Sequence, residues 1–194
     1  HAGDNWQDRS LVTSGRYFSE RPRQLSRVLD ALLASPEWGS RIPADRIGAV
    51  GHSAGGYLAL LVGFDESRLR PYGFGLKDVA GIAQVSGQVF THYTVREERG
   101  LSRYATTADE AAPAFFVRKA LPPLLTIYAE NDMAGRAEEN LYLLAMLKGA
   151  GHAETTSLKA VGKDHGSVGH DLRFADDPGH QAVLRFIRTQ AEKR

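Results

Sequence analysis

Cysteine is absent from the 194-residue chain, which excludes disulfides, thiolate metal sites and a thiol nucleophile. No uninterrupted apolar run approaches the roughly 18 residues that a membrane-spanning helix needs, so we expect no membrane span. A charge excess is also lacking, because the formal net charge is only +1. This near balance gives no electrostatic argument for binding to nucleic acid or to an anionic membrane.

The sequence shows no signal-peptide pattern, and it begins with His1 rather than Met. We therefore expect a soluble chain, with the cytoplasm favoured, whose sequence begins inside a longer gene product. The composition, with 42% hydrophobic and 24% charged residues, is that of an ordinary globular protein. Its length suits one domain with a sizeable core, so we expect a single domain over residues 1–194.

Segments with helical and strand-like spacing alternate along the chain. Strands alternating with helices predict an α/β fold, with a mostly parallel sheet covered by helices on both faces. The helix expected after the first strand is apolar nearly all round, which predicts burial on most sides. The predicted elements are a helix over residues 19–33, a strand at 47–50, a helix at 57–64, strands at 79–85 and 124–129, a helix at 135–148, a strand at 155–161 and a last helix from 177.

Residues 88–120 carry mixed charges and aromatic side chains without a regular period. We expect this segment to form an excursion over the carboxyl edge of the sheet, near the active site and forming part of a substrate cleft. Its aromatic residues are candidates for the lining of an apolar acyl pocket: Phe90, Tyr93, Tyr104, Phe115 and Phe116.

The strongest motif is Gly51-His52-Ser53-Ala54-Gly55, which lies between an apolar strand-like run and an apolar helix-like run. This is the pattern of a nucleophile elbow, in which a strained turn presents a serine at a helix N-terminus. Gly51 and Gly55 are expected to let the strand and the helix close on each other, and Gly56 is expected to add further room. The Ala54 N–H is expected to point at the place where negative charge develops.

A serine hydroxyl needs a base within hydrogen-bond reach and a third group that orients the base. In an open parallel sheet such residues lie at the carboxyl ends of the strands. Asp132 follows the strand at 124–129, and His165 follows the strand at 155–161. The chain order Ser53, Asp132, His165 is the order of α/β-hydrolase triads.

Rival residues stay open for the acid and for the base. Glu130 precedes Asp132 by two residues, and His170 lies on the same predicted loop as His165. We favour His165, because glycines at 162 and 166 favour a mobile, close-packed loop. His52 is expected to pack within the turn rather than to act as the base.

No pattern argues for a metal or a cofactor. The two histidines and the carboxylate in residues 165–171 have loop spacing, which is weak evidence beside a helical His-Glu-x-x-His pattern. A Walker-type loop and the G-x-G-x-x-G fingerprint are both lacking. We therefore expect no metal, no cofactor and no nucleic-acid partner, and a small-molecule ester as substrate.

The motifs resemble those of the α/β-hydrolase superfamily, in its carboxylesterase and dienelactone-hydrolase-like group. The elbow, together with residues 21–22, 28–33 and 44–48, is similar to predicted dienelactone hydrolases and acetylhydrolase-like lipases. Residues 85–88, 122–125 and 163–165 resemble esterases related to arylformamidase. The resemblance implies a serine hydrolase that cleaves carboxylic esters through an acyl-enzyme intermediate. An amidase or formamidase with the same triad, or a non-catalytic binding protein, is the alternative.

One departure from that family concerns the region before the elbow. The family has several strands there and an early His-Gly loop that supplies a second oxyanion N–H, whereas only 46 residues precede Ile47. We therefore expect the amino-terminal strands to be lacking from this sequence. His1-Ala2-Gly3-Asp4 is either a degenerate form of that loop or a later stretch of the family pattern. The Ala54 N–H is then the one oxyanion donor that the sequence identifies. Loss of the second donor would lower turnover by about 10²–10³-fold.

Overall fold

The structure is a computed structural model, and it describes residues 27, 30–32, 34–37, 39 and 47–193. The chain divides into two compact units, His1–Ala44 and Asp45–Arg194. In the first unit, Arg27 and residues 30–32 are helical, inside the helix predicted over residues 19–33. The rest of that helix and the His1–Asp4 stretch lie outside the described residues.

The second unit is built on a parallel sheet, as the sequence predicts. Its strands lie in the order β1-β2-β3-β4, and each neighbouring pair is parallel. The central strands are buried apolar runs, with Ile82, Leu124 and Ile127 fully buried, as is usual for strands covered on both faces. The bounds are β1 Ile47–His52, β2 Val79–Val85, β3 Leu124–Asn131 and β4 Thr155–Asp164.

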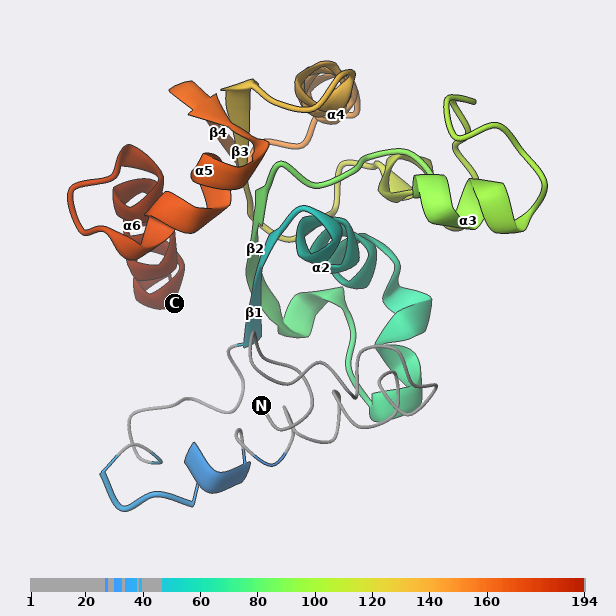
Figure 1. Cartoon of the computed structure of the whole chain (residues 1–194). Coiled ribbons are helices and arrows are strands. Elements are labelled where there is room, and N and C mark those ends of the chain that lie inside the picture. Colours follow the sequence, from blue (N-terminus) through green and yellow to red (C-terminus); the bar gives the residue numbers. More distant parts are fainter. Residues whose placement is uncertain (1–26, 28–29, 33, 38, 40–46, 194) are drawn as a thin grey trace. The chain divides into compact units, whose positions relative to one another are not determined.

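Helices cover both faces of this sheet, which confirms the predicted layers of an α/β-hydrolase fold (Figure 1). Helix α2 packs on β1 and β2 and helix α4 on β3, whereas α5 and α6 pack from the other side. One apolar core joins Leu60 and Phe64 of α2 to Leu143 of α4. A second core joins Ile127 to Val168 of α5. The helices are α2 Ala54–Phe64, α3 Tyr93–Glu98, α4 Arg136–Gly149, α5 His165–His170 and α6 Pro178–Glu192.

The helix after the elbow is buried on most of its sides, as its apolar composition predicts. The helix begins at Ala54, directly after the serine, and it buries Tyr57, Leu60 and Phe64 against the sheet. Leu58 and Val62 point away from these contacts and are 58% and 38% exposed. The exposed positions 54, 55, 58 and 62 form one strip along the helix, and its other seven residues are buried.

His165 lies at the start of a helix, so the prediction of a mobile loop around it is wrong. Strand β4 continues through Gly162 to Asp164, and α5 begins at His165. The Asp164 carboxylate accepts a hydrogen bond from the Ser167 N–H at 2.7 Å and so caps the new helix. The histidine is consequently held between a strand end and a capped helix.

Residues 88–120 are more ordered than their lack of periodicity indicated. They contain α3 and the short helix η5 (Pro113–Phe116), which are too short to show a helical period. Asp109 ties the segment together, because its carboxylate accepts hydrogen bonds from Thr91 at 2.9 Å and from Arg99 at 2.7 Å. The other short helices are η2 Glu66–Arg68, η3 Arg70–Tyr72, η4 Leu76–Asp78 and η6 Asp171–Arg173.

None of the helices in the described part of the chain has the length and the apolar character needed to cross a membrane.

Candidate active site

Ser53 occupies the sharp turn between β1 and α2, with φ 56° and ψ −120°. A positive φ is strained for any residue with a side chain, and it persists only where its surroundings hold it. Here the Ser53 N–H donates to the Val85 carbonyl at 2.9 Å, and the Ser53 carbonyl accepts from the Tyr57 N–H at 3.0 Å. Both the neighbouring strand and the following helix therefore fix the serine in place.

Of the two glycines expected to close the elbow, only Gly51 stands where a side chain would not fit. A Cβ on Gly51 would lie 2.2 Å from the Gly55 carbonyl oxygen, which no side chain tolerates. A Cβ on Gly55 would meet nothing within 4 Å, so the expectation for Gly55 is wrong. Gly56 is required by space, in agreement with the expectation, because its Cβ would lie 3.0 Å from the Cα of Gly87.

The structure brings Ser53, His165 and Asp132 together. The His165 Nε2 atom lies 2.9 Å from the Ser53 hydroxyl oxygen, and its Nδ1 atom lies 2.6 Å from the Asp132 carboxylate. The Asp132 side chain is fully buried, and the His165 side chain is 22% exposed. A proton on Nδ1, donated to the carboxylate, leaves Nε2 free to accept the serine proton. This arrangement can activate the serine as a nucleophile.

The two rival residues are engaged elsewhere. The Glu130 carboxylate pairs with Lys159 at 2.7 Å and accepts from the Gly162 N–H at 3.0 Å. The hydrogen bond from Lys159 holds the pKa of Glu130 below its usual range. The His170 side chain is 57% exposed, and its Nδ1 atom lies 2.9 Å from Asp171. Each rival therefore has a partner on the surface.

His52 packs inside the turn, in agreement with the interpretation from the sequence. Its Nε2–H donates to the backbone carbonyl of His165 at 2.8 Å, and the two imidazole rings lie 4.9 Å apart. Burial lowers the pKa of His52, which favours its neutral form. Gly169 lies against this ring, where a Cβ would come within 2.6 Å of it. His52 thus links the elbow to α5 and fixes the backbone of His165.

Sequence reasoning missed Ser86, which supports the acid. The Ser86 hydroxyl donates to the second carboxylate oxygen of Asp132 at 2.5 Å, while the Met133 N–H donates to the first oxygen at 2.8 Å. The Arg136 guanidinium in turn donates to the Ser86 carbonyl at 2.7 Å. Ser86 directly follows strand β2, just as Ser53 follows β1. A polar residue directly after a predicted strand was therefore the sequence signal that could have identified Ser86 as a site residue.

Arg136 is a second residue near the acid that no motif in the sequence indicates. It is only 6% exposed, and burial lowers its pKa, although an arginine keeps its charge in proteins. Its backbone carbonyl accepts a hydrogen bond from Asn140, which also donates to the Gly87 carbonyl. These hydrogen bonds connect the start of α4 to the residues that directly follow β2, one of which, Ser86, contacts the Asp132 carboxylate.

The Ala54 N–H stands at the amino terminus of α2. The first amides of a helix have no acceptor inside it, and the helix dipole makes this end partly positive. Ala54 therefore has the geometry expected of an oxyanion donor. No group of three or more His, Asp or Glu side chains in the described part of the chain is placed to hold a metal ion.

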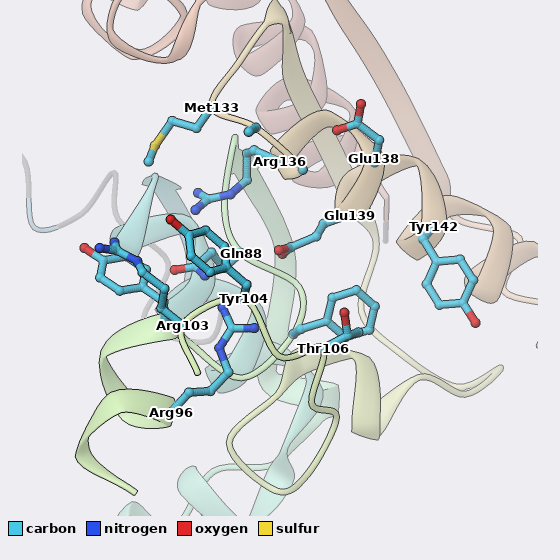
Figure 2. A pocket seen from close by; sticks show the side chains of 14 residues that line it. Gln88, Arg96, Arg103, Tyr104, Thr106, Met133, Arg136, Glu138, Glu139 and Tyr142 are labelled. Atoms are coloured by element: carbon cyan, nitrogen blue, oxygen red, sulfur yellow. The ribbon is translucent and has the colours of Figure 1, made fainter. Parts of the chain in front are cut away.

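A cavity of about 770 Å³ lies beside the acid loop (Figure 2). Residues 133–136, which directly follow Asp132, form one wall, and Gln88 and Phe90 of the excursion form another. Three of the five aromatic residues expected to line a pocket do so, whereas Phe115 and Phe116 do not. The lining residues are Gln88, Phe90, Tyr93, Arg96, Arg103, Tyr104, Thr106, Met133, Ala134, Gly135, Arg136, Glu138, Glu139 and Tyr142.

Solved structures of several hydrolases share this fold. A truncated carbohydrate esterase from gut microbiota matches 79% of this chain and 63% of its own at a TM-score of 0.59 and 18% identity. Propionate-bound esterase 2 from Thermogutta terrifontis matches 74% of this chain and 54% of its own at a TM-score of 0.53 and 19% identity. Acylaminoacyl peptidase from Pyrococcus horikoshii matches 80% of this chain and 26% of its own at a TM-score of 0.57 and 16% identity.

These identities support a common fold, and the chain spans less than two thirds of the length of each of the three structures. None of the curated protein sequences compared with the chain matches it. The family model of the prolyl oligopeptidase family matches residues 19–194.

Proposed function

The chain belongs to the prolyl oligopeptidase family, and we propose that it is a serine hydrolase that cleaves carboxylic esters through an acyl-enzyme intermediate. The observation that carries this proposal is the position of the His165 imidazole, which lies 2.9 Å from the Ser53 hydroxyl and 2.6 Å from Asp132. Ester-cleaving proteins among the similar structures support the same bond type. The chemistry requires no cofactor.

In the proposed reaction, the Ser53 oxygen bonds to the acyl carbon while His165 takes the serine proton. Asp132 holds the imidazole in the required tautomer and stabilises its charged form, and the Ala54 N–H stabilises the tetrahedral oxyanion. The ester C–O bond then breaks, and His165 protonates the departing alcohol. A water molecule, activated by the same imidazole, finally releases the acid and restores the serine.

A fluorophosphonate probe tests whether the serine is activated. We expect the probe to label the wild-type chain at Ser53, and the chain to hydrolyse 4-nitrophenyl acetate, because an imidazole in contact raises the nucleophilicity of the hydroxyl. Mass spectrometry of the labelled peptide locates the modified residue, and Ser53→Ala is the control. Equal hydrolysis by the wild type and by Ser53→Ala would reject the proposal in favour of a non-catalytic binding protein.

Replacement of Asp132 by asparagine is expected to lower kcat by about 10⁴-fold, because an amide favours the wrong imidazole tautomer. The matched control is Glu130→Gln, which removes a charge two residues away without touching His165. Its kcat is expected to stay near the wild-type value. Steady-state kinetics on 4-nitrophenyl acetate gives both values, and a larger loss in Glu130→Gln would reassign the acid.

An amide or peptide bond is the second candidate substrate, favoured by membership of a peptidase family and by an acylaminoacyl peptidase among the similar structures. The triad chemistry is the same for both bonds. Turnover of an N-formyl aryl amide, compared with that of the aryl ester, separates the two candidates. Faster cleavage of the amide, relative to its uncatalysed rate, would favour the amidase.

A further inference from the structure

Two buried side chains of the cavity beside the acid loop have unsatisfied polar atoms. Gln88 is 3% exposed, and its Oε1 atom has no hydrogen-bond partner among the residues that the structure describes. Arg96 is 6% exposed, and its Nε–H is likewise unpaired. Leaving such groups unpaired in the interior costs about 1–3 kcal/mol each. Both side chains line the same cavity, and a turn of either side chain toward it would let a bound molecule supply the lacking partner.

The two unpaired atoms need hydrogen-bond partners of opposite kinds. The Gln88 oxygen needs a donor, and the Arg96 Nε–H needs an acceptor. A hydroxyl group supplies both, whereas a carboxylate supplies only acceptors and an ammonium group only donors. A neutral group with hydroxyls therefore fits the pair better than an ion of either sign.

The remaining charged groups of the cavity support a neutral occupant. Arg136 is engaged by the Ser86 carbonyl, and the Glu139 carboxylate accepts from the Val89 N–H at 2.9 Å. Figure 2 shows Arg96 and Arg136 reaching toward the cavity from opposite sides. Because arginine and glutamate side chains both line the space, no single sign of charge dominates it.

Aromatic rings form much of the remaining wall. Tyr104 is 86% exposed at the rim, and the Arg103 guanidinium lies 4.8 Å above the ring of Tyr93. Phe90 and Tyr142 lie 5.9 Å apart, centre to centre, on the side of α4. The negative face of an aromatic ring attracts the weakly positive C–H groups of a saturated ring. Flat aromatic walls beside hydroxyl-binding groups are therefore suited to a sugar ring.

We propose that this cavity is a subsite for the sugar of a carbohydrate ester, in which Gln88 and Arg96 bind one hydroxyl and Tyr104 covers the ring. The proposal rests on the proposed ester hydrolysis. A volume of about 770 Å³ is that of an ordinary small-molecule pocket. The wall formed by residues 133–136 follows Asp132 directly in the chain, so the proposed subsite adjoins the loop that carries the acid.

The test compares kcat/KM for methyl 6-O-acetyl-glucoside with kcat/KM for cyclohexylmethyl acetate, a primary acetate of similar size without ring hydroxyls. We expect the wild type to prefer the sugar ester and Gln88→Leu to lose about tenfold of this preference, as for one lost hydrogen bond. Tyr104→Ala should lower the preference as well. Tyr72→Ala, at another exposed tyrosine outside the cavity, should leave it unchanged. An unchanged preference in both cavity variants would overturn the proposal.

Gln88→Leu is a usable probe because it removes an unpaired buried oxygen. Its thermal midpoint is expected to equal or exceed that of the wild type. Tyr104→Ala is an exposed change and provides a second probe that does not depend on folding of the interior. A preference for an acetate ester that carries a carboxylate would also overturn the proposal, because it would assign the arginines to an anion.

Binding of methyl glucoside to Ser53→Ala, measured by titration calorimetry, separates this proposal from the proposed hydrolysis. Binding that Gln88→Leu weakens, without turnover of any acetate by the wild type, would keep the sugar subsite and reject the hydrolase. Ser53-dependent turnover of 4-nitrophenyl acetate, with neither glucoside binding nor a sugar preference, would reject the subsite and keep the hydrolase.

Discussion

Replacement of His165 by alanine is expected to lower kcat for 4-nitrophenyl acetate by about 10⁶-fold, the loss seen when a serine hydrolase loses its base. His165 is the one group in contact with both the Ser53 hydroxyl and the Asp132 carboxylate in the described part of the chain. Without it, the hydroxyl keeps its proton and the leaving alcohol receives none. Steady-state measurements of 4-nitrophenyl acetate hydrolysis on the purified wild type and on the purified variant give the two kcat values.

The matched control for this prediction is His170→Ala. His170 lies five residues along the same helix, is 57% exposed and contacts Asp171, so its loss should leave kcat close to the wild-type value. The double variant Ser53→Ala with His165→Ala tests whether the two residues act as a unit. Its loss should equal that of either single variant. A larger effect at His170, or losses that multiply in the double variant, would contradict the proposed base.

The placement of the site could be predicted because of a rule of parallel sheets. The carboxyl ends of the strands meet at one edge, so polar residues after β1, β3 and β4 were expected to converge. The fold class followed from the alternation of strands and helices, and the similar structures and the family match confirm it. The catalytic roles of Ser53, Asp132 and His165 stay predictions, supported by their contacts.

The choice between neighbouring residues could not be made from the sequence. Glu130 is an exposed residue of β3 and pairs with Lys159 on the adjacent strand, whereas Asp132 lies past the strand end and has a fully buried side chain. That difference depends on the residue at which β3 ends. The boundary between β4 and α5 likewise depends on the Asp164 cap, which a loop-like Gly-Lys-Asp-His-Gly pattern conceals.

The backbone strain at the site was also invisible in the sequence. Ser53 and Ser86 are the non-glycine residues with positive φ in the described part of the chain. Each follows a strand and extends its ladder, because the Ser53 N–H donates to Val85 and the Ser86 N–H donates to Ile127 at 2.8 Å. Such strain costs of order 1–3 kcal/mol per residue and persists where the surroundings over-determine it. Two adjacent strand ends thus hold the nucleophile and the partner of the acid in fixed positions.

Replacement of Gly51 by alanine is expected to destabilise the fold by more than about 4 kcal/mol, a loss seen only for severe steric or buried-polar defects. The new Cβ would lie 2.2 Å from the Gly55 oxygen and 2.8 Å from the Gly56 nitrogen. Both atoms are backbone, so neither can rotate away, and β1 and α2 would have to separate. At about 2–4 °C per kcal/mol for a chain of this size, the thermal midpoint should fall by roughly 10 °C or more.

Gly55→Ala is the matched control, because it adds the same methyl group on the other side of Ser53. Its Cβ meets nothing within 4 Å, and alanine stabilises a helix by about 1 kcal/mol relative to glycine. The midpoint of this variant should therefore equal or exceed that of the wild type, and fluorophosphonate labelling of Ser53 should be retained. Equal midpoints for the two variants would show that the strand and the helix can separate without cost. A large difference would mean that one glycine, rather than the symmetric pair of the motif, closes the turn that presents the serine.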